Sequence, residues 1–245
     1  MSSILSYFSP RNSLPELYQI YYLFAFSSVG NPLVLFLRKL GLNCTEPKNN
    51  PASRTVSTLI FFENVYLELF WFDDKIDLAQ SDLTTEFNFP ARVNWLETGA
   101  SPFGFGLSYP TDNSNFPTST VEARRTDQTQ IPEQLSQFLS SNLANPKEPI
   151  CYVVPNYVAT RNRLDRVFTT IEQMVTQTLG MRQLTHVKLT VIRDCILTPP
   201  LASFFAQNLL EIEYGKHPLL ELTFDNGNQK RFLDLIPLMP IVLRY

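Results

Sequence analysis

The sequence predicts an α+β fold with mixed, mostly antiparallel sheets, and three observations favour it. Residues 19–73 read as a strand, a helix and three further strands, an order that fits neither a doubly wound sheet nor a sandwich. A second group of strand candidates lies between residues 184 and 235. The chain of 245 residues also contains 19 Phe and 10 Tyr but only 8 Gly, a composition that favours strands around an apolar interior.

The first unit is predicted from apolar runs and the residues that separate them. The run Gln19–Phe26 is almost continuously apolar, as expected of a buried strand. Pro32 suits the first turn of a helix and Gly41 suits a helix end. Glu63 and Asn64 form a tight hairpin turn between two apolar runs. The expected elements are strand 19–26, helix 33–40, and strands 42–46, 55–62 and 65–72.

The remaining chain predicts more strands and two longer helices. Helical spacing of apolar residues is present over residues 131–143 and, most clearly, over residues 160–179 before Gly180. The run Asp-Asn-Gly-Asn at residues 225–228 has the chemistry of a hairpin turn. Further strands are expected over residues 103–109, 118–124, 149–154, 184–192, 209–214, 218–224 and 230–235.

Composition and missing motifs exclude several classes of protein. A net charge of −3 gives no basic surface for nucleic acid. Mean hydropathy near zero and the absence of a signal-like segment predict no membrane span and a cytoplasmic protein. Three cysteines without a C-x-x-C spacing indicate neither a zinc ribbon nor a disulfide framework. Sequence motifs of serine hydrolases, P-loop NTPases and dinucleotide-binding dehydrogenases do not occur.

The most informative residue is Glu68, the one carboxylate in the aromatic strand of residues 65–72. A buried carboxylate is costly unless a partner, a hydrogen bond or a metal stabilises it. Strand alternation places Glu68 on one face with Tyr66, Phe70 and Phe72, and Trp71 on the other face. The same alternation predicts that Ile20, Tyr22, Phe24 and Phe26 share a face of the first strand.

The unit carries Tyr66-Leu-Glu-Leu69 just after Phe61-Phe-Glu-Asn64, and in this it resembles the glyoxalase-like members of the vicinal oxygen chelate superfamily. The resemblance implies βαβββ modules whose curled sheets surround a cavity. It implies that the Glu68 face lines this cavity and that the Trp71 face packs on helix 33–40. It also implies a paired-module domain over residues 17–155, with a second module opening near residue 100. A helix and strand extension over residues 156–245 is expected to pack on that domain, either as a separate part or as part of the same domain. Glu68 matches the metal-binding Glu of such modules, but Tyr22 stands at or beside the position of the usual His.

A metal-free site for a small molecule is therefore expected, with no cofactor. Tyr22 and Glu68 should meet inside, where the phenol can donate a hydrogen bond to the carboxylate. They then either recognise a ligand or satisfy each other in the core, and both alternatives stay open. Glu68 is also a candidate acid or base. Arg92 is a candidate for an acidic ligand group, although most arginines are solvated. The ligand-binding candidates are Tyr22, Phe24, Glu68, Phe70, Phe72 and Arg92.

Two other functions compete with this one. A metal-dependent lyase, isomerase or dioxygenase would need a rearranged ligand set such as Glu68, His186 and Glu221 around a divalent metal. With only two histidines in the chain, His186 and Glu221 are better interpreted as a satisfied or surface pair. A purely structural or interaction protein is the third class. The expected partners are a small molecule and neither nucleic acid nor a membrane, and the expected assembly is a monomer or homodimer.

Overall fold

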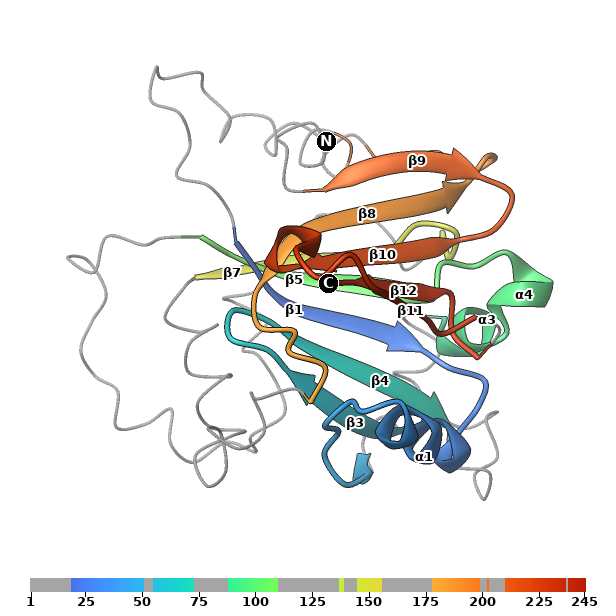
Figure 1. Ribbon diagram of the computed structural model, residues 1–245. Coiled ribbons are helices and arrows are strands. Elements are labelled where there is room, and N and C mark those ends of the chain that lie inside the picture. Colours follow the sequence, from blue (N-terminus) through green and yellow to red (C-terminus); the bar gives the residue numbers. More distant parts are fainter. Residues whose placement is uncertain are drawn as a thin grey trace, which may run out of the picture.

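The computed structural model describes residues 19–50, 55–72, 88–109, 137–138, 145–155, 178–198, 202, 210–236 and 238–245. These residues form two mixed β-sheets with a few short helices, which confirms the α+β class (Figure 1). Neither sheet closes on itself within the described residues.

The first sheet has seven strands in the order β2-β3-β4-β1-β5-β7-β6. β1 lies between β4, to which it is parallel, and β5, to which it is antiparallel. β3 and β4 form the hairpin predicted at Glu63 and Asn64. Its strands are β1 (Gln19–Phe26), β2 (Lys48–Asn50), β3 (Thr55–Phe61), β4 (Tyr66–Phe72), β5 (Phe103–Tyr109), β6 (Gln137–Phe138) and β7 (Ile150–Pro155).

The second sheet has five strands in the order β11-β12-β10-β8-β9. The hairpin predicted at residues 225–228 is wrong, because β12 lies between β10 and β11 and pairs with both. The turn itself exists as the short 3-10 helix η5 (Asp225–Gly227). The strands are β8 (Leu184–Ile192), β9 (Glu211–Gly215), β10 (Leu219–Phe224), β11 (Phe232–Asp234) and β12 (Ile241–Arg244), the last of which the sequence analysis missed.

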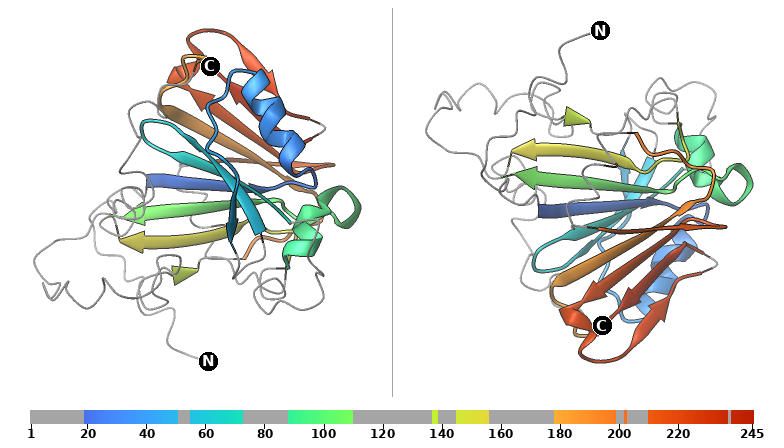
Figure 2. Two further views of the ribbon diagram at one scale, coloured as in Figure 1. Left: turned by 90° about the horizontal axis from the view of Figure 1, so that it is seen from below. Right: turned by 90° about the horizontal axis from the view of Figure 1, so that it is seen from above.

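The two sheets share one apolar core (Figure 2). Leu23 and Phe105 of the first sheet belong to the same buried cluster as Leu189 and Leu222 of the second. Burial of such side chains is the main favourable contribution to folding. The described parts of residues 17–155 and of residues 156–245 thus contribute to one common core.

Helix α1 (Asn31–Lys39) packs on the first sheet as the sequence predicts. Its Val34 contacts the cluster that contains Trp71 of β4. Gly30 precedes the helix, and a Cβ there would lie 2.9 Å from the Trp71 ring, so only glycine lets the chain pass this closely. Two short helices, α3 (Phe89–Val93) and α4 (Trp95–Thr98), precede β5. Among the described helices none has the length and apolar character to cross a membrane.

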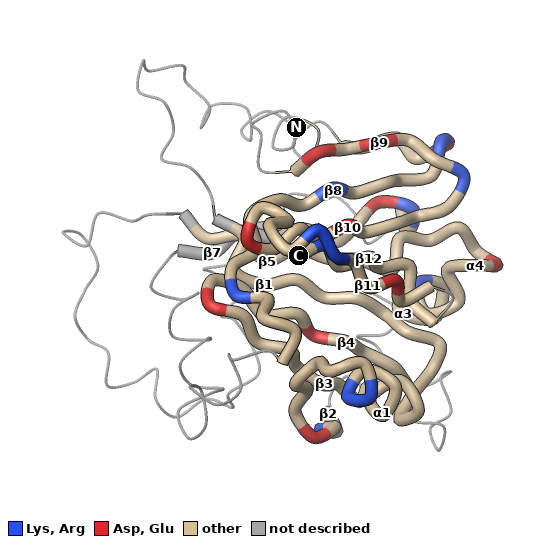
Figure 3. Tube along the Cα trace, in the orientation of Figure 1, with Lys and Arg blue, Asp and Glu red and all other residues tan. Residues whose placement is uncertain are grey.

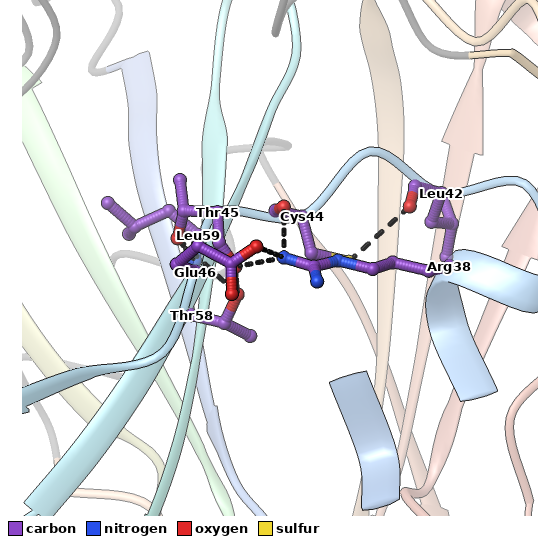
Figure 4. A network of polar contacts seen from close by, with 7 residues as sticks. All are labelled: Arg38, Leu42, Cys44, Thr45, Glu46, Thr58 and Leu59. Carbon is purple, nitrogen blue, oxygen red and sulfur yellow. Dashed lines mark hydrogen bonds and ion pairs between the residues drawn. The ribbon is translucent and has the colours of Figure 1, made fainter. Parts of the chain in front are cut away.

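The strand predicted over residues 42–46 is displaced to β2, and the contacts of Arg38 explain why (Figure 4). Arg38 Nη2 donates to the carbonyls of Cys44 and Thr45, both at 3.2 Å, and to Glu46 Oε1 at 2.8 Å. The Thr45 hydroxyl accepts a hydrogen bond from the backbone N–H of Leu59 at 2.9 Å. These side-chain hydrogen bonds stand in place of a regular ladder. The segment keeps the bridge of Cys44 with Ile60 and the hydrogen bond from the Thr45 N–H to the Leu59 carbonyl at 2.9 Å.

Two predicted helices differ in outcome. The helix over residues 131–143 is wrong at Gln137 and Phe138, because these residues form β6 and pair with β7. The helix over residues 160–179 lies outside the described residues apart from its last two positions, and the strand over residues 118–124 lies outside them entirely.

The β3–β4 turn is fastened to the start of β8 by side chains. Asn64 Nδ2 donates to the Leu184 carbonyl at 2.8 Å, and the Leu184 N–H donates to Asn64 Oδ1 at 2.9 Å. Gln183 Nε2 and Arg182 Nε donate to the Glu63 carboxylate at 2.9 and 2.6 Å. The hydrogen bond from Gln183, and then that from Arg182, lowers the pKa of Glu63 below its usual value of 4.5. The turn therefore joins one end of the first sheet to the second.

Candidate functional site

Glu68 stands out in the first sheet as a charged residue beside strands that carry no charge. In Figure 3 it is the one acidic segment of β4, and β1, β3 and β5 carry no charged residue. The parallel pairing of β1 with β4 places Phe24 opposite Glu68 and Tyr22 opposite Tyr66. The Glu68 face lies away from the second sheet, because the alternate residues Leu67 and Leu69 point into the shared core.

The Glu68 carboxylate is held by two hydroxyl groups. Its side chain is buried, with 6% of the residue exposed. Tyr22 Oη donates to Oε2 at 2.7 Å, and Ser57 Oγ donates to Oε1 at 2.7 Å. Hydrogen bonds to a charged acceptor are stronger than those between neutral groups. The structure thus brings Tyr22 and Glu68 together, as strand alternation predicted, and adds Ser57 from β3.

Aromatic rings surround this polar group and form what we call the aromatic face. The Tyr22 ring lies 4.6 Å from that of Tyr66 and 5.3 Å from that of Phe24, measured between centroids. Phe70 meets Phe24 edge to face at 6.0 Å. Aromatic pairs at these separations add to the stability that burial gives. The aromatic face consists of Tyr21, Tyr22, Phe24, Phe26, Phe61, Tyr66 and Ile150, with Leu59, Phe70, Phe89 and Val93 packed against them.

A β-bulge in β1 corrects one predicted position. The register with β5 shifts between Ile20 and Tyr22. Tyr21 and Tyr22 consequently both belong to the aromatic face, whereas Ile20 packs against the shared core. The prediction that Ile20 lies on the Tyr22 face is therefore wrong, because a bulge inserts one residue and reverses the alternation before it.

Gly104 of β5 makes room for Phe24. The two residues are paired across the strands, and a Cβ at Gly104 would lie 1.9 Å from Phe24 Cζ. The Phe24 ring therefore lies directly over the glycine, in space that any other side chain would occupy. In the sequence Gly104-Phe-Gly106, packing against Phe24 thus accounts for the first glycine.

The more open side of the site is toward β3. Ser57, Leu59, Phe70 and Phe72 are half-buried, whereas Tyr22 is buried. Ser57 pairs with Phe70, and Leu59 pairs with Glu68, so these three half-buried positions border the carboxylate. Phe72 lies further along β4 and pairs with Thr55. The sequence analysis missed Ser57, although counting the register back from the hairpin turn places it diagonally opposite Glu68 on the same face. A carboxylate in this setting can accept hydrogen bonds from a ligand or act as a general base.

Arg92 lies elsewhere and is fully buried, so the expectation of a solvated arginine is wrong. Its Nη1 donates to the backbone carbonyls of Ser101 at 2.7 Å and of Glu148 at 2.9 Å. Burial lowers the pKa of Arg92 to about 10, and the nearby Glu148 carboxylate opposes this shift. These bonds tie α3 to the chain before β5 and before β7.

Glu148 is a second buried charge, which the sequence did not reveal. It is fully buried, and its Oε1 accepts hydrogen bonds from the N–H of Thr198 at 2.6 Å and the hydroxyl of Thr198 at 2.9 Å. Glu148 lies in the polar stretch Asn-Pro-Lys-Glu, whose composition is that of a solvated loop. It also interacts electrostatically with the buried Arg92, and its bonds to Thr198 join the segment before β7 to the segment after β8.

The residues of the alternative metal site are not brought together. His186 Nε2 lies 3.2 Å from Glu211 Oε2 on the exposed surface of the second sheet. Glu221 accepts a hydrogen bond from Arg244 Nε at 3.0 Å and is paired across the strands with Lys188. Glu68 belongs to the other sheet. Over the described part of the chain, no three His, Cys, Asp or Glu side chains are grouped to hold a metal ion.

The three cysteines are free thiols. Burial raises the pKa of Cys44 to about 11 and that of Cys195 to about 11, and it also raises the pKa of Cys151. A raised pKa disfavours the nucleophilic thiolate, so these residues are structural, as the sequence predicts.

No family model and no curated protein matches the chain. One similar solved structure is that of a hypothetical protein from Staphylococcus aureus, with 9% sequence identity and a TM-score of 0.48. The match covers 93% of this chain and 98% of that protein.

Proposed function

We propose that the chain binds a small, partly apolar molecule at the aromatic face, with Glu68 as its polar anchor. The observation that carries this proposal is a carboxylate only 6% exposed, whose two oxygens accept hydrogen bonds from Tyr22 and Ser57. Ligand sites combine mostly apolar walls with a few convergent polar groups. Tyr22 fixes the carboxylate from the buried side, and half-buried Ser57 marks the side from which a ligand approaches.

A structural role for the same group is the competing explanation. Buried polar groups are generally hydrogen-bonded, whatever their function. However, buried charged groups contribute little net stability, since apolar side chains of similar volume often replace them without loss. A carboxylate retained among aromatic side chains is therefore better explained by recognition than by stability.

We further propose that the first unit is of the glyoxalase-like kind. This is supported by the element order β1-α1-β2-β3-β4, with β4 parallel to β1 and Glu68 on the face opposite the helix. On this proposal Tyr22 replaces the usual metal-binding His and makes the site metal-free.

A fragment screen on the full chain tests the function. A set of small aromatic and aliphatic amines, acids and neutral alcohols is added to isotopically labelled protein, and backbone amide shifts are followed. Binders should shift Ser57, Leu59 and Phe70. Glu68→Gln should weaken binding about tenfold or more, because it removes the charge from a buried polar contact. The matched control Glu211→Gln removes an exposed carboxylate of the second sheet and should leave affinity unchanged.

Two results would contradict the proposal. In one, no fragment shifts these three amides. In the other, fragments shift them, yet the folded Glu68→Gln variant binds as tightly as the unaltered chain.

A further inference from the structure

We infer that the ligand of this site is a small organic cation with an ammonium group. The inference rests on the proposed function and concerns the chemical class of the molecule that Glu68 anchors. Three features of the described residues carry it: the direction of the hydrogen bonds, the aromatic surroundings, and the pairing of Arg92 with groups other than Glu68.

The hydrogen-bond directions make the site an acceptor. Tyr22 and Ser57 both direct their hydroxyl hydrogens to the Glu68 carboxylate. An ionised carboxylate accepts at both oxygens and donates nothing, and a hydroxyl that has given up its hydrogen can then only accept. Any further hydrogen bond between these hydroxyl or carboxylate oxygens and a ligand is therefore one that the protein accepts. A matching group must bring hydrogen atoms, positive charge or both.

The aromatic surroundings favour the same charge. Ring faces carry negative electrostatic potential, and a cation within about 6 Å of a ring centroid is attracted by it. Phe70 is half-buried and is paired across the strands with Ser57, whose hydroxyl donates to Glu68 Oε1, so Phe70 borders the carboxylate on its more open side. The carboxylate and the rings thus attract positive charge at one place. An anionic group would be repelled by both.

Arg92 does not reverse this preference. It is the residue that sequence analysis assigned to an acidic ligand group. In the structure its Nη1 donates to the carbonyls of Ser101 and Glu148, and the carboxylate that opposes its pKa shift is that of Glu148. The positive charge of Arg92 thus acts at the buried pair that it forms with Glu148.

A pair of molecules of equal shape tests the inference. Choline and 3,3-dimethylbutan-1-ol differ only in a charged nitrogen against a neutral carbon. Each is titrated into the full chain, and the amide shifts of Ser57 and Phe70 give the affinity. Choline is expected to bind at least about tenfold more tightly than the alcohol, because a desolvated cation–π contact and a nearby carboxylate both favour the charged molecule.

The outcomes separate the two proposals. Equal affinity for both molecules overturns the cation inference and supports the binding site. If neither binds but neutral or acidic fragments shift Ser57 and Phe70, the cation inference alone is overturned. If no molecule of any class shifts these amides, both proposals are overturned.

Two variants attribute the preference to particular groups. Glu68→Gln should lower the affinity for choline to that for the alcohol. The control Glu211→Gln should leave the ratio of the two affinities unchanged. If Glu68→Gln does not fold, Phe70→Leu serves instead, because Phe70 is half-buried and its loss is tolerated more easily. That variant should reduce the ratio severalfold, whereas Phe232→Leu, an exposed ring of the second sheet, should not. A ratio that neither Glu68→Gln nor Phe70→Leu reduces overturns the inference.

Discussion

Replacing Tyr22 with phenylalanine removes one hydrogen-bond donor from Glu68 and leaves the aromatic ring in place. The ring contacts with Tyr66 and Phe24, at 4.6 and 5.3 Å, do not depend on the hydroxyl. Tyr22 and Glu68 are 7% and 6% exposed, so bulk water does not readily replace the lost donor. Tyr22→Phe therefore isolates the contribution of the 2.7 Å bond to a buried carboxylate.

The expected cost follows from these facts. A hydrogen bond to a charged group contributes about 1.5–3 kcal/mol, so Tyr22→Phe should lower the free energy of unfolding by about 2 kcal/mol. For a chain of this length that corresponds to a fall in Tm of about 4 °C. Ser57→Ala should cost less, about 1 kcal/mol or below, because Ser57 is half-buried and a water molecule can take over its hydrogen bond.

Urea unfolding of four proteins checks the reasoning: the unaltered chain, Tyr22→Phe, Glu68→Gln and the double variant. The coupling energy between the two sites should be about 1–2 kcal/mol. Tyr214→Phe, a tyrosine that is 55% exposed, is the control and should be neutral. A coupling energy under about 0.5 kcal/mol would show that the bond to Glu68 is not the source of the effect.

Three further predictions concern the surrounding structure. Arg92→Met should lower the free energy of unfolding, measured by urea unfolding, by about 3–5 kcal/mol, because it removes a buried cation beside Glu148. A loss below about 1 kcal/mol would refute the pairing of Arg92 with Glu148. Gly104→Ala should cost about 1–3 kcal/mol because it displaces the Phe24 ring, and adding Phe24→Leu should recover part of that loss; no recovery would refute the packing argument. Glu63 has a lowered pKa in the folded chain, so its contribution to stability is present above its ordinary pKa of 4.5 and is lost as pH falls through the lowered value. A carboxyl NMR titration of the folded chain should give a midpoint below 4.5, and a midpoint at or above 4.5 contradicts this.

Local patterns in the sequence are sufficient to predict that Tyr22 and Glu68 meet at the centre of the site. Alternation along two apolar strands places Tyr22 and Glu68 on one face, and the hairpin turn at Glu63 and Asn64 fixes the register of β3 against β4. The same register also places Ser57 of β3 diagonally opposite Glu68 of β4. Alternation within a single strand does not reveal this contact, because it requires the pairing of the two strands. These features depend on residues close together in the chain or on a period of two.

Other features depend on contacts that no local pattern encodes. The bulge that turns Tyr21 to the aromatic face arises in the pairing of β1 with β5, about 85 residues further along the chain. The burial of Arg92 requires carbonyls from two separate segments. Most arginines are solvated, and an expectation based on residue type is wrong for Arg92 because the tertiary structure supplies buried carbonyl acceptors.

The place of β12 has a consequence for how the second sheet forms. β11 pairs with β12, and the described part of β10 pairs with β8 and β12, so the chain segments before and after η5 are not neighbours. A local hairpin at this turn therefore cannot serve as a folding nucleus. Within the described residues, β11 forms an antiparallel pair with β12, the next strand in the chain, and joins the sheet only through the pairing of β12 with β10. We expect the amide hydrogens of β11 to gain protection from exchange together with those of β12 and after those of the β8–β10 pair.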